Sequence, residues 1–126
     1  MGKRIMFFAI WLSSSLYAMP TQCYDSLSGE YDLQTGKEKS LKKDKLKLYF
    51  KQDGKDFLVS SNQYNWNPLV MIANNEENAQ FLEPISAGVV LYTYHKKIKK
   101  MVIQKSYSYP LIGSLIVTAV LNKCIE

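Results

Sequence analysis

Residues 45–59 decide the fold, and they read Lys-Leu-Lys-Leu-Tyr-Phe-Lys-Gln-Asp-Gly-Lys-Asp-Phe-Leu-Val. The apolar residues at 46, 48 and 50 alternate with lysine and tyrosine. A period of two places them on one face of a β-strand, with a solvent-facing side opposite. The Asp-Gly pair at 53–54 tolerates positive φ, and an apolar run resumes at residue 57. The segment therefore predicts a β-hairpin with one wet face.

The same period recurs along the chain, and no long helical stripe accompanies it. Residues 89–94 are β-branched and aromatic, a polar turn follows at 95–100, and a further strand is expected from 101 to 107. Residues 114–121 are apolar on both faces, so that strand should be central or covered. Weaker strand candidates are 29–34, 69–73 and 79–82, although 76–82 could instead form a short helix. We expect an all-β domain, a small antiparallel barrel or sandwich of about seven or eight strands.

Two cysteines, Cys23 and Cys124, lie near opposite ends of the chain and are the only ones in it. In an oxidising compartment, two cysteines without competitors are expected to pair. We therefore predict one structural disulfide that ties the first strand to the last.

The first eighteen residues have the pattern of a secretory signal. Lys3 and Arg4 supply the positive charge, residues 5–12 form an apolar run, and Ala18 is small enough to precede a cleavage site. An uncleaved anchor is disfavoured because the apolar run is far shorter than the roughly 20 residues of a spanning helix. The prediction is a signal peptide over 1–18 and one exported domain over 19–126, with no stable membrane anchor after cleavage.

Without Lys3 and Arg4, 14 of the 16 basic residues remain, against 11 acids. All 14 are lysines. Arginine provides the planar fork that grips phosphates and guanine edges, so its absence argues against nucleic-acid binding.

The residues that support catalysis or metal binding are sparse. His95 is the one histidine and falls within a lysine-rich turn. A Ser-His-Asp triad would need that imidazole buried beside a carboxylate, and zinc sites need three or four Cys or His ligands. Pairs of carboxylates such as Glu30 and Asp32 are too common on strands to indicate glycosidase chemistry. We expect no enzyme, no catalytic residues, no metal and no cofactor.

Lysines are concentrated in residues 37–55, where eight stand against three acids. Lys45 and Lys47 lie on the wet side of the first hairpin. A basic face of this kind suits an anionic envelope polymer or an acidic protein. The alternative is that these lysines guard exposed strands against edge-to-edge pairing.

Aromatic residues in expected loops are the other candidate binding feature. Tyr64 and Trp66 occur in the polar segment Tyr-Asn-Trp-Asn-Pro, and Tyr107 and Tyr109 form a second cluster. Such side chains supply rigid contact area with a polar group, which suits recognition of a protein or sugar. The alternative is that the rings close the ends of the barrel or sandwich as apolar plugs.

Together these features favour a non-enzymatic binding or interaction module in the bacterial periplasm or outside the cell. An envelope protein or polymer is the expected class of partner. The alternative is a carrier that holds a small apolar ligand inside a barrel, because small barrels either enclose one ligand or are filled by their own side chains. The sequence leaves the oligomeric state open.

Overall fold

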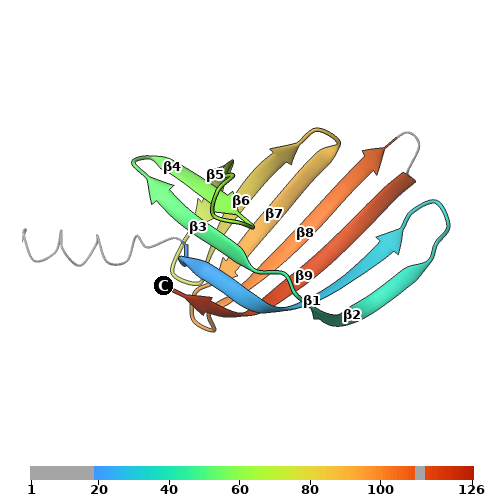
Figure 1. Cartoon of the computed structure of the whole chain (residues 1–126), viewed down its shortest axis with the longest axis horizontal. Helices are drawn as coiled ribbons and strands as arrows, with labels where there is room; N and C mark the ends of the chain where they lie inside the picture. The colour runs from blue at the N-terminus through green and yellow to red at the C-terminus, as the bar shows by residue number, and fades with distance from the viewer. Residues whose placement is uncertain (1–18, 110–112) are drawn as a thin grey trace, which may run out of the picture.

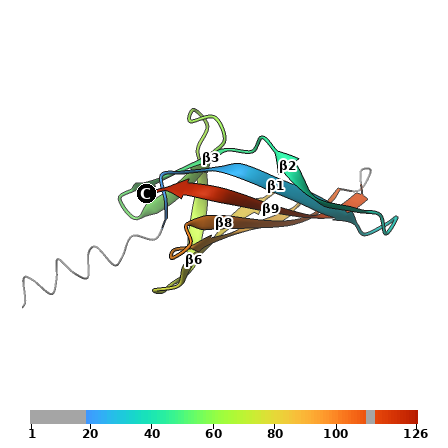
Figure 2. The same ribbon diagram turned by 90° about the horizontal axis from the view of Figure 1, so that it is seen from below.

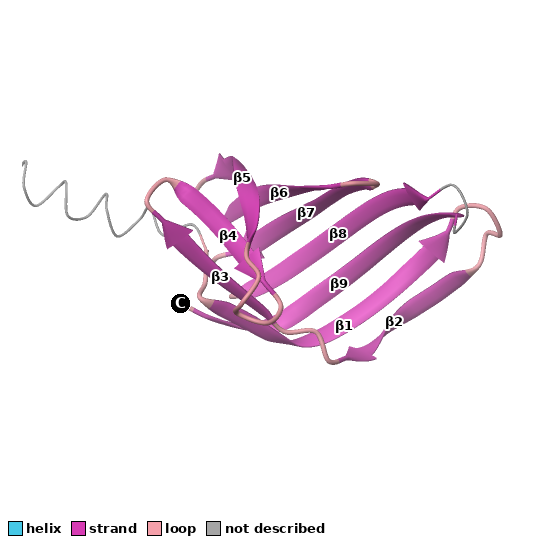
Figure 3. Ribbon diagram, turned by 45° about the horizontal axis from the view of Figure 1, so that its top comes forward, coloured by secondary structure: helices cyan, strands magenta, loops and turns pink. Residues whose placement is uncertain are grey.

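The computed structural model describes residues 19–109 and 113–126 as nine antiparallel strands, with no helix among them (Figure 3). The expected signal peptide lies outside these residues. The strands are β1 (Gln22–Asp32), β2 (Glu38–Asp44), β3 (Leu48–Asp53), β4 (Asp56–Ser60), β5 (Asn67–Asn74), β6 (Asn78–Ile85), β7 (Gly88–His95), β8 (Lys100–Tyr109) and β9 (Gly113–Ile125).

Eight of these strands close into a barrel, and β2 is one strand more. From β3 to β9 each strand pairs with the next in the chain, and β9 pairs with β1. One edge of β1 serves two partners, since Gln22 and Cys23 pair with β3 while Ser26 to Tyr31 pair with β2. The all-β prediction is confirmed, and the architecture is a barrel.

Side chains from the alternating inner positions fill the barrel. The rings of Phe50 and Tyr92 meet edge to face with centroids 6.0 Å apart, and those of Phe57 and Phe81 lie 5.2 Å apart. Both arrangements are favourable for aromatic pairs beyond the burial of their area. Other buried residues of this core are Leu48, Val59, Leu69, Ala79, Val90, Tyr94, Met101, Ile103, Ala119 and Leu121.

The disulfide between Cys23 and Cys124 is present, as predicted. The two residues are direct cross-strand partners in the β1–β9 ladder, and Cys23 is fully buried. Close by, Asp25 has a φ of 60°, a value that residues other than glycine rarely adopt. It interrupts the alternation of β1, so that Cys23 and Ser26 are both buried.

The long strands extend beyond the closed part of the barrel. Strands β3, β4 and β5 gather at one end, whereas β7, β8, β9 and β1 run on to the other (Figure 1). In this extension the last residues of β6, from Glu83 to Ile85, pair with β7 alone. Pro84 lies on that edge, where a missing N–H donor is tolerated. The molecule is therefore a barrel at one end and an open curved sheet at the other.

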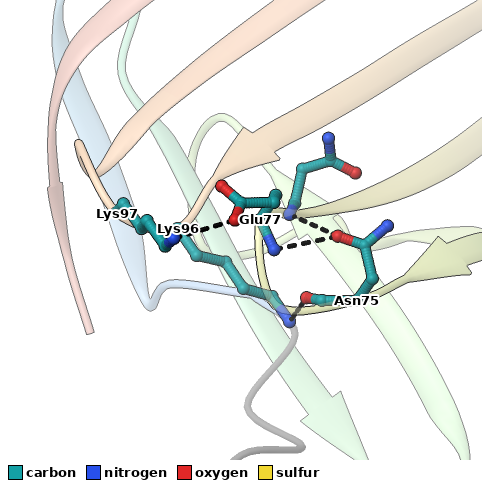
Figure 4. A network of polar contacts seen from close by, with 5 residues as sticks. Asn75, Glu77, Lys96 and Lys97 are labelled. Atoms are coloured by element: carbon teal, nitrogen blue, oxygen red, sulfur yellow. Dashed lines mark hydrogen bonds and ion pairs between the residues drawn. The ribbon is translucent and has the colours of Figure 1, made fainter.

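Two turns at the closed end are joined by a polar network. The Nζ of Lys96 donates to the carbonyl oxygen of Asn75 at 2.6 Å, and the Nζ of Lys97 lies 2.8 Å from Oε1 of Glu77 (Figure 4). The Asn75 side chain accepts hydrogen bonds from the N–H groups of Glu77 and Asn78. Burial lowers the pKa of Lys96. The lysine-rich turn after β7 thus holds the β5–β6 turn in place.

Two details of the fold differ from the sequence-based expectations. The possible helix over 76–82 is wrong, because Asn78–Ile85 forms β6 in the middle of a sheet. Strand β2 was not predicted at all. Every residue of β2 is exposed, so the strand has no buried face and no alternating signal.

Candidate functional site

A short loop between β4 and β5 is fixed by two side chains at its start. The Oγ of Ser60 accepts the N–H groups of Asn62 and Gln63 at 3.2 and 2.9 Å. The Oδ1 of Asn62 accepts those of Tyr64 and Asn65 at 2.8 and 2.9 Å. Ser and Asn side chains stabilise turns by this kind of bond to nearby backbone. The loop is therefore ordered by its own hydrogen bonds.

This loop presents Tyr64 to solvent. The residue is 87% exposed, and the loop stands out from the body of the barrel (Figure 2). Gln63, just before it, has a φ of 68° and accepts a hydrogen bond of 3.1 Å from the indole Nε1 of Trp66 through its carbonyl oxygen. The Trp66 indole thus stabilises the loop through this hydrogen bond, while the exposed Tyr64 ring can contact a partner.

Lysines lie over aromatic rings along the neighbouring outer face of β3. The Nζ of Lys51 is 4.2 Å from the ring centroid of Trp66. The Nζ of Lys47 is 5.3 Å from the ring centroid of Tyr49 and 6.0 Å from that of Tyr24. Cation–π contacts at exposed positions are worth about 0.5–1 kcal/mol each. We call the set formed by Tyr24, Lys47, Tyr49, Lys51, Tyr64 and Trp66 the aromatic–lysine surface.

The salt bridges of the described residues leave out both lysines of this surface. The salt bridges among the described residues are Lys39–Glu30, Lys97–Glu77 and Lys99–Glu126. Neither Lys47 nor Lys51 takes part in one. Both Nζ groups lie beside aromatic ring faces, so the surface can offer cationic and aromatic contacts together to a partner.

The structure brings together three of the residues proposed from sequence and places two others, Tyr107 and Tyr109, elsewhere. Tyr64, Trp66 and Lys47 belong to the aromatic–lysine surface. Tyr107 and Tyr109 lie at the far end of β8, on the open part of the sheet (Figure 1). Their rings pack edge to face at 5.4 Å, and the Nζ of Lys105 is 4.8 Å from the Tyr107 centroid.

Lys45 lies in the segment between β2 and β3, exposed and two residues before Lys47. Its backbone N–H donates to Oδ1 of Asp44 at 2.8 Å. Three residues of the aromatic–lysine surface, Tyr24, Tyr49 and Lys51, were not among the binding residues proposed from the sequence. Tyr49 and Lys51 lie on the wet face of β3 and continue the alternation that begins at Lys47, so that pattern already pointed to them. Tyr24 could not be found in this way, because its contact with Lys47 joins β1 to the residue just before β3.

One buried carboxylate lies on the inner face of the barrel. The hydroxyl of Tyr92 donates to Oε1 of Glu83 at 2.5 Å, and Glu83 is 9% exposed. Burial raises the pKa of the Tyr92 hydroxyl well above its usual value, and the neighbouring carboxylate raises it further. The phenol therefore stays protonated and donates to the carboxylate. Glu83 is the only buried acid among the described residues, and its hydrogen bond to Tyr92 makes it part of the packed core.

Among the described residues, no three His, Cys, Asp or Glu side chains gather to form a metal site. His95 is half-buried at the end of β7, opposite Lys100.

The barrel core is occupied by side chains such as Phe81, Tyr94 and Met101. Two open hollows of about 350 and 300 Å³ flank the β1–β2 ladder instead. The part of the chain that the structure describes also lacks any helix of the length and apolarity needed to cross a membrane.

Comparison with protein-family models finds no match, and comparisons with curated proteins and with solved structures find none either.

Proposed function

We propose that the chain is an exported, non-enzymatic binding domain that recognises an acidic protein or anionic polymer of the cell envelope through its aromatic–lysine surface. The observation that carries this proposal is the exposure of Tyr64 on a loop ordered by its own hydrogen bonds. A ring held ready for contact loses little conformational entropy on binding, which favours affinity.

The charges of the surface indicate the class of partner. Lys47 and Lys51 lie over rings and have no acidic partner within the described part of the chain. Carboxylates or phosphates of a partner would add charge-assisted contacts at the rim, and tyrosine and tryptophan would supply the buried centre of an interface. Electrostatic attraction of this kind weakens with added salt.

Export is part of the same proposal. A buried disulfide is consistent with folding in an oxidising compartment, the bacterial periplasm or the external medium. N-terminal sequencing of the protein recovered from its host tests this directly. We expect a mature chain that begins at Met19 or within a few residues of it. Recovery of the uncleaved chain from the cytoplasm would contradict the proposal.

A pull-down from an envelope fraction of the host tests the recognition surface. The wild-type domain is compared with Tyr64→Ala and with the matched control Tyr109→Ala, which removes an exposed tyrosine at the opposite end of the molecule. We expect a partner retained by the wild type and the control and lost from Tyr64→Ala. Equal retention by Tyr64→Ala would remove this surface from the interface, and loss only from Tyr109→Ala would move the site to the open sheet.

Carriage of a small apolar ligand has no comparable support. The side chains of the core fill the interior of the barrel, and the two hollows flank the β1–β2 ladder. Binding by the outer surface is therefore the function that the geometry favours.

A further inference from the structure

Strands β2 and β3 follow one another along the same edge of β1 (Figure 1). Lys39 of β2 pairs with Glu30, and Tyr49 of β3 pairs with Gln22. Both strands run antiparallel to β1, so the chain from Lys39 to Tyr49 travels in one direction along that edge. The stretch of β1 between Gln22 and Glu30 is up to about 27 Å long, at roughly 3.4 Å per residue. Residues 39–51 therefore form an extended line and not a compact patch.

Six exposed lysines lie on this line. We name the following set the basic edge: Lys39, Lys42, Lys43, Lys45, Lys47 and Lys51. The Nζ of Lys39 lies 3.1 Å from Oε1 of Glu30, and the salt bridges among the described residues include none of the other five lysines. Glu38 and Asp53 lie beyond the two ends of the set. The basic edge is thus a run of positive charges that acids border at its ends.

One acid interrupts the basic edge. Asp44 is the only acid in the sequence between Lys39 and Lys51. Its Oδ2 accepts a hydrogen bond of 2.9 Å from the Ser28 hydroxyl, and its Oδ1 accepts one of 2.8 Å from the N–H of Lys45. The Asp44 carboxylate is therefore bonded to β1 and to the backbone beside it, and makes no ion pair with a lysine of the set.

The two ends of the basic edge differ in what surrounds the lysines. At one end, Lys42 and Lys43 line an open hollow of about 300 Å³ beside the β1–β2 ladder. At the other end, Lys47 and Lys51 lie over the rings of the aromatic–lysine surface. Successive lysines are separated by up to about 14 Å of extended strand. Most of these separations are within the Debye length of about 8 Å at physiological ionic strength, so the potentials of neighbouring lysines add.

The linear arrangement selects the class of partner. A flexible chain with repeated negative charges can follow an extended line and meet its lysines in turn, and each such contact releases counterions from the polymer. A folded acidic protein, whose surface is convex, would meet only part of that line. Lysines on an edge strand also disfavour the addition of a further strand, which argues against an acidic peptide in β conformation.

We propose that the partner is a linear polyanion that lies along the basic edge, from the hollow at β2 to the rings around Lys51. The basic edge extends the site of the proposed function, on which this inference rests, from β3 onto β2. The opposing interpretation assigns the β2 lysines to the protection of an exposed edge alone. In that case a polyanion would contact no more of the chain than the aromatic–lysine surface.

Isothermal titration calorimetry with two polyanions tests the proposal. The probes are a galacturonate dodecamer and a polyphosphate of matched length, which distinguish carboxylate from phosphate as the recognised group. The double variant Lys42→Gln, Lys43→Gln removes two charges from β2, where every residue is exposed. The matched control Lys99→Gln, Lys100→Gln removes two charges where β7 turns into β8.

For at least one probe, we expect the β2 double variant to raise the dissociation constant at least fivefold and the control to change it less than twofold. The dependence of affinity on salt should also weaken in the β2 variant alone, because fewer counterions are released on binding. Equal affinities of the β2 variant and the control would overturn the proposal. Self-association of the β2 variant in sedimentation velocity, with unchanged polymer binding, would overturn it in favour of edge protection.

Tyr64→Ala separates the failure of this proposal from the failure of the proposed function. A polymer affinity that falls in Tyr64→Ala but not in the β2 variant would overturn the basic edge and retain the aromatic–lysine surface. An affinity that falls in the β2 variant but not in Tyr64→Ala would support the basic edge and contradict the proposed function. A wild type that binds neither probe, while the pull-down retains an acidic protein through Tyr64, would overturn the polyanion alone.

Discussion

Cys23 and Cys124 are direct partners in the β1–β9 ladder, and their disulfide bond lies where the strand that opens the barrel meets the strand that closes it. The sequence separation of 101 residues spans nearly the whole described domain. In the chain-entropy account, a cross-link between such distant residues removes much of the freedom of the unfolded chain.

Replacement of both cysteines by serine should therefore lower the free energy of unfolding by roughly 3–5 kcal/mol. The barrel should persist, because nine further register pairs join β1 to β9. Urea unfolding of the oxidised wild type and of the double variant measures the difference. A loss below about 1 kcal/mol would show that the disulfide adds little beyond the ladder itself.

Tyr92→Phe and Tyr94→Phe form an informative pair, because each removes one hydroxyl that donates to a glutamate. The acceptor of Tyr92 is Glu83, which is 9% exposed, whereas the acceptor of Tyr94 is Glu126, whose side chain is 45% exposed. A buried acceptor that loses its donor costs about 1–3 kcal/mol, whereas water replaces the donor at an exposed one. Tyr92→Phe should thus destabilise the domain clearly more than Tyr94→Phe in urea unfolding. Equal losses would contradict this account.

Acid should weaken the turn between β1 and β2. Hydrogen bonds from the backbone N–H groups of Gln34 and Thr35 hold the pKa of the Asp32 carboxyl below its ordinary value of 3.8. A group with a lowered folded pKa stabilises the fold above its unfolded pKa, and this contribution is lost as the pH falls through the folded value. Below pH 4 the wild type should therefore lose stability, and Asp32→Asn should lose less over the same range. Carboxyl-carbon NMR titration should give a midpoint below 3.8, and a midpoint above 3.8 would contradict the prediction.

Gly88 begins β7 where no side chain fits. A Cβ atom there would overlap the carbonyl oxygen of Ser106 and lie 2.9 Å from the Cα of Tyr107, both backbone atoms of β8. Gly88→Ala must therefore separate the ends of the two strands. Overpacking of this kind costs roughly 1–3 kcal/mol. Thermal unfolding should show a lower midpoint, and amide exchange should quicken at the β7–β8 end first. An unchanged midpoint would mean that the strands part there without cost.

The sequence predicted those parts of the fold in which one face of a strand is buried and the other is wet. The hairpin at Asp53 and Gly54 and the hairpin around His95 both followed from alternation and turn residues, and both are confirmed. Strand β1 was predicted only in its second half, because Asp25 interrupts its alternation. Strand β2 was not predicted because only its pairing with β1 defines it. The sequence of β2 itself carries no sign of that pairing.

The same distinction applies to the candidate site. Tyr64, Trp66 and Lys47 could be selected by residue type and loop position. Their relation to Tyr24 and their separation from Tyr109 depend on the order of strands around the barrel. Likewise, the apolar outer side of β9 was visible in the sequence, but the row that it forms with β8 and β1 required the register.

The most direct test of recognition by the aromatic–lysine surface is the affinity of the purified domain for the partner that the pull-down identifies. We predict that Tyr64→Ala raises the dissociation constant at least tenfold, a change of about 1.4 kcal/mol or more. Tyr109→Ala should leave it within twofold, and the wild-type affinity should fall as salt is raised. A Tyr64→Ala domain that binds as tightly as the wild type would contradict the proposed function.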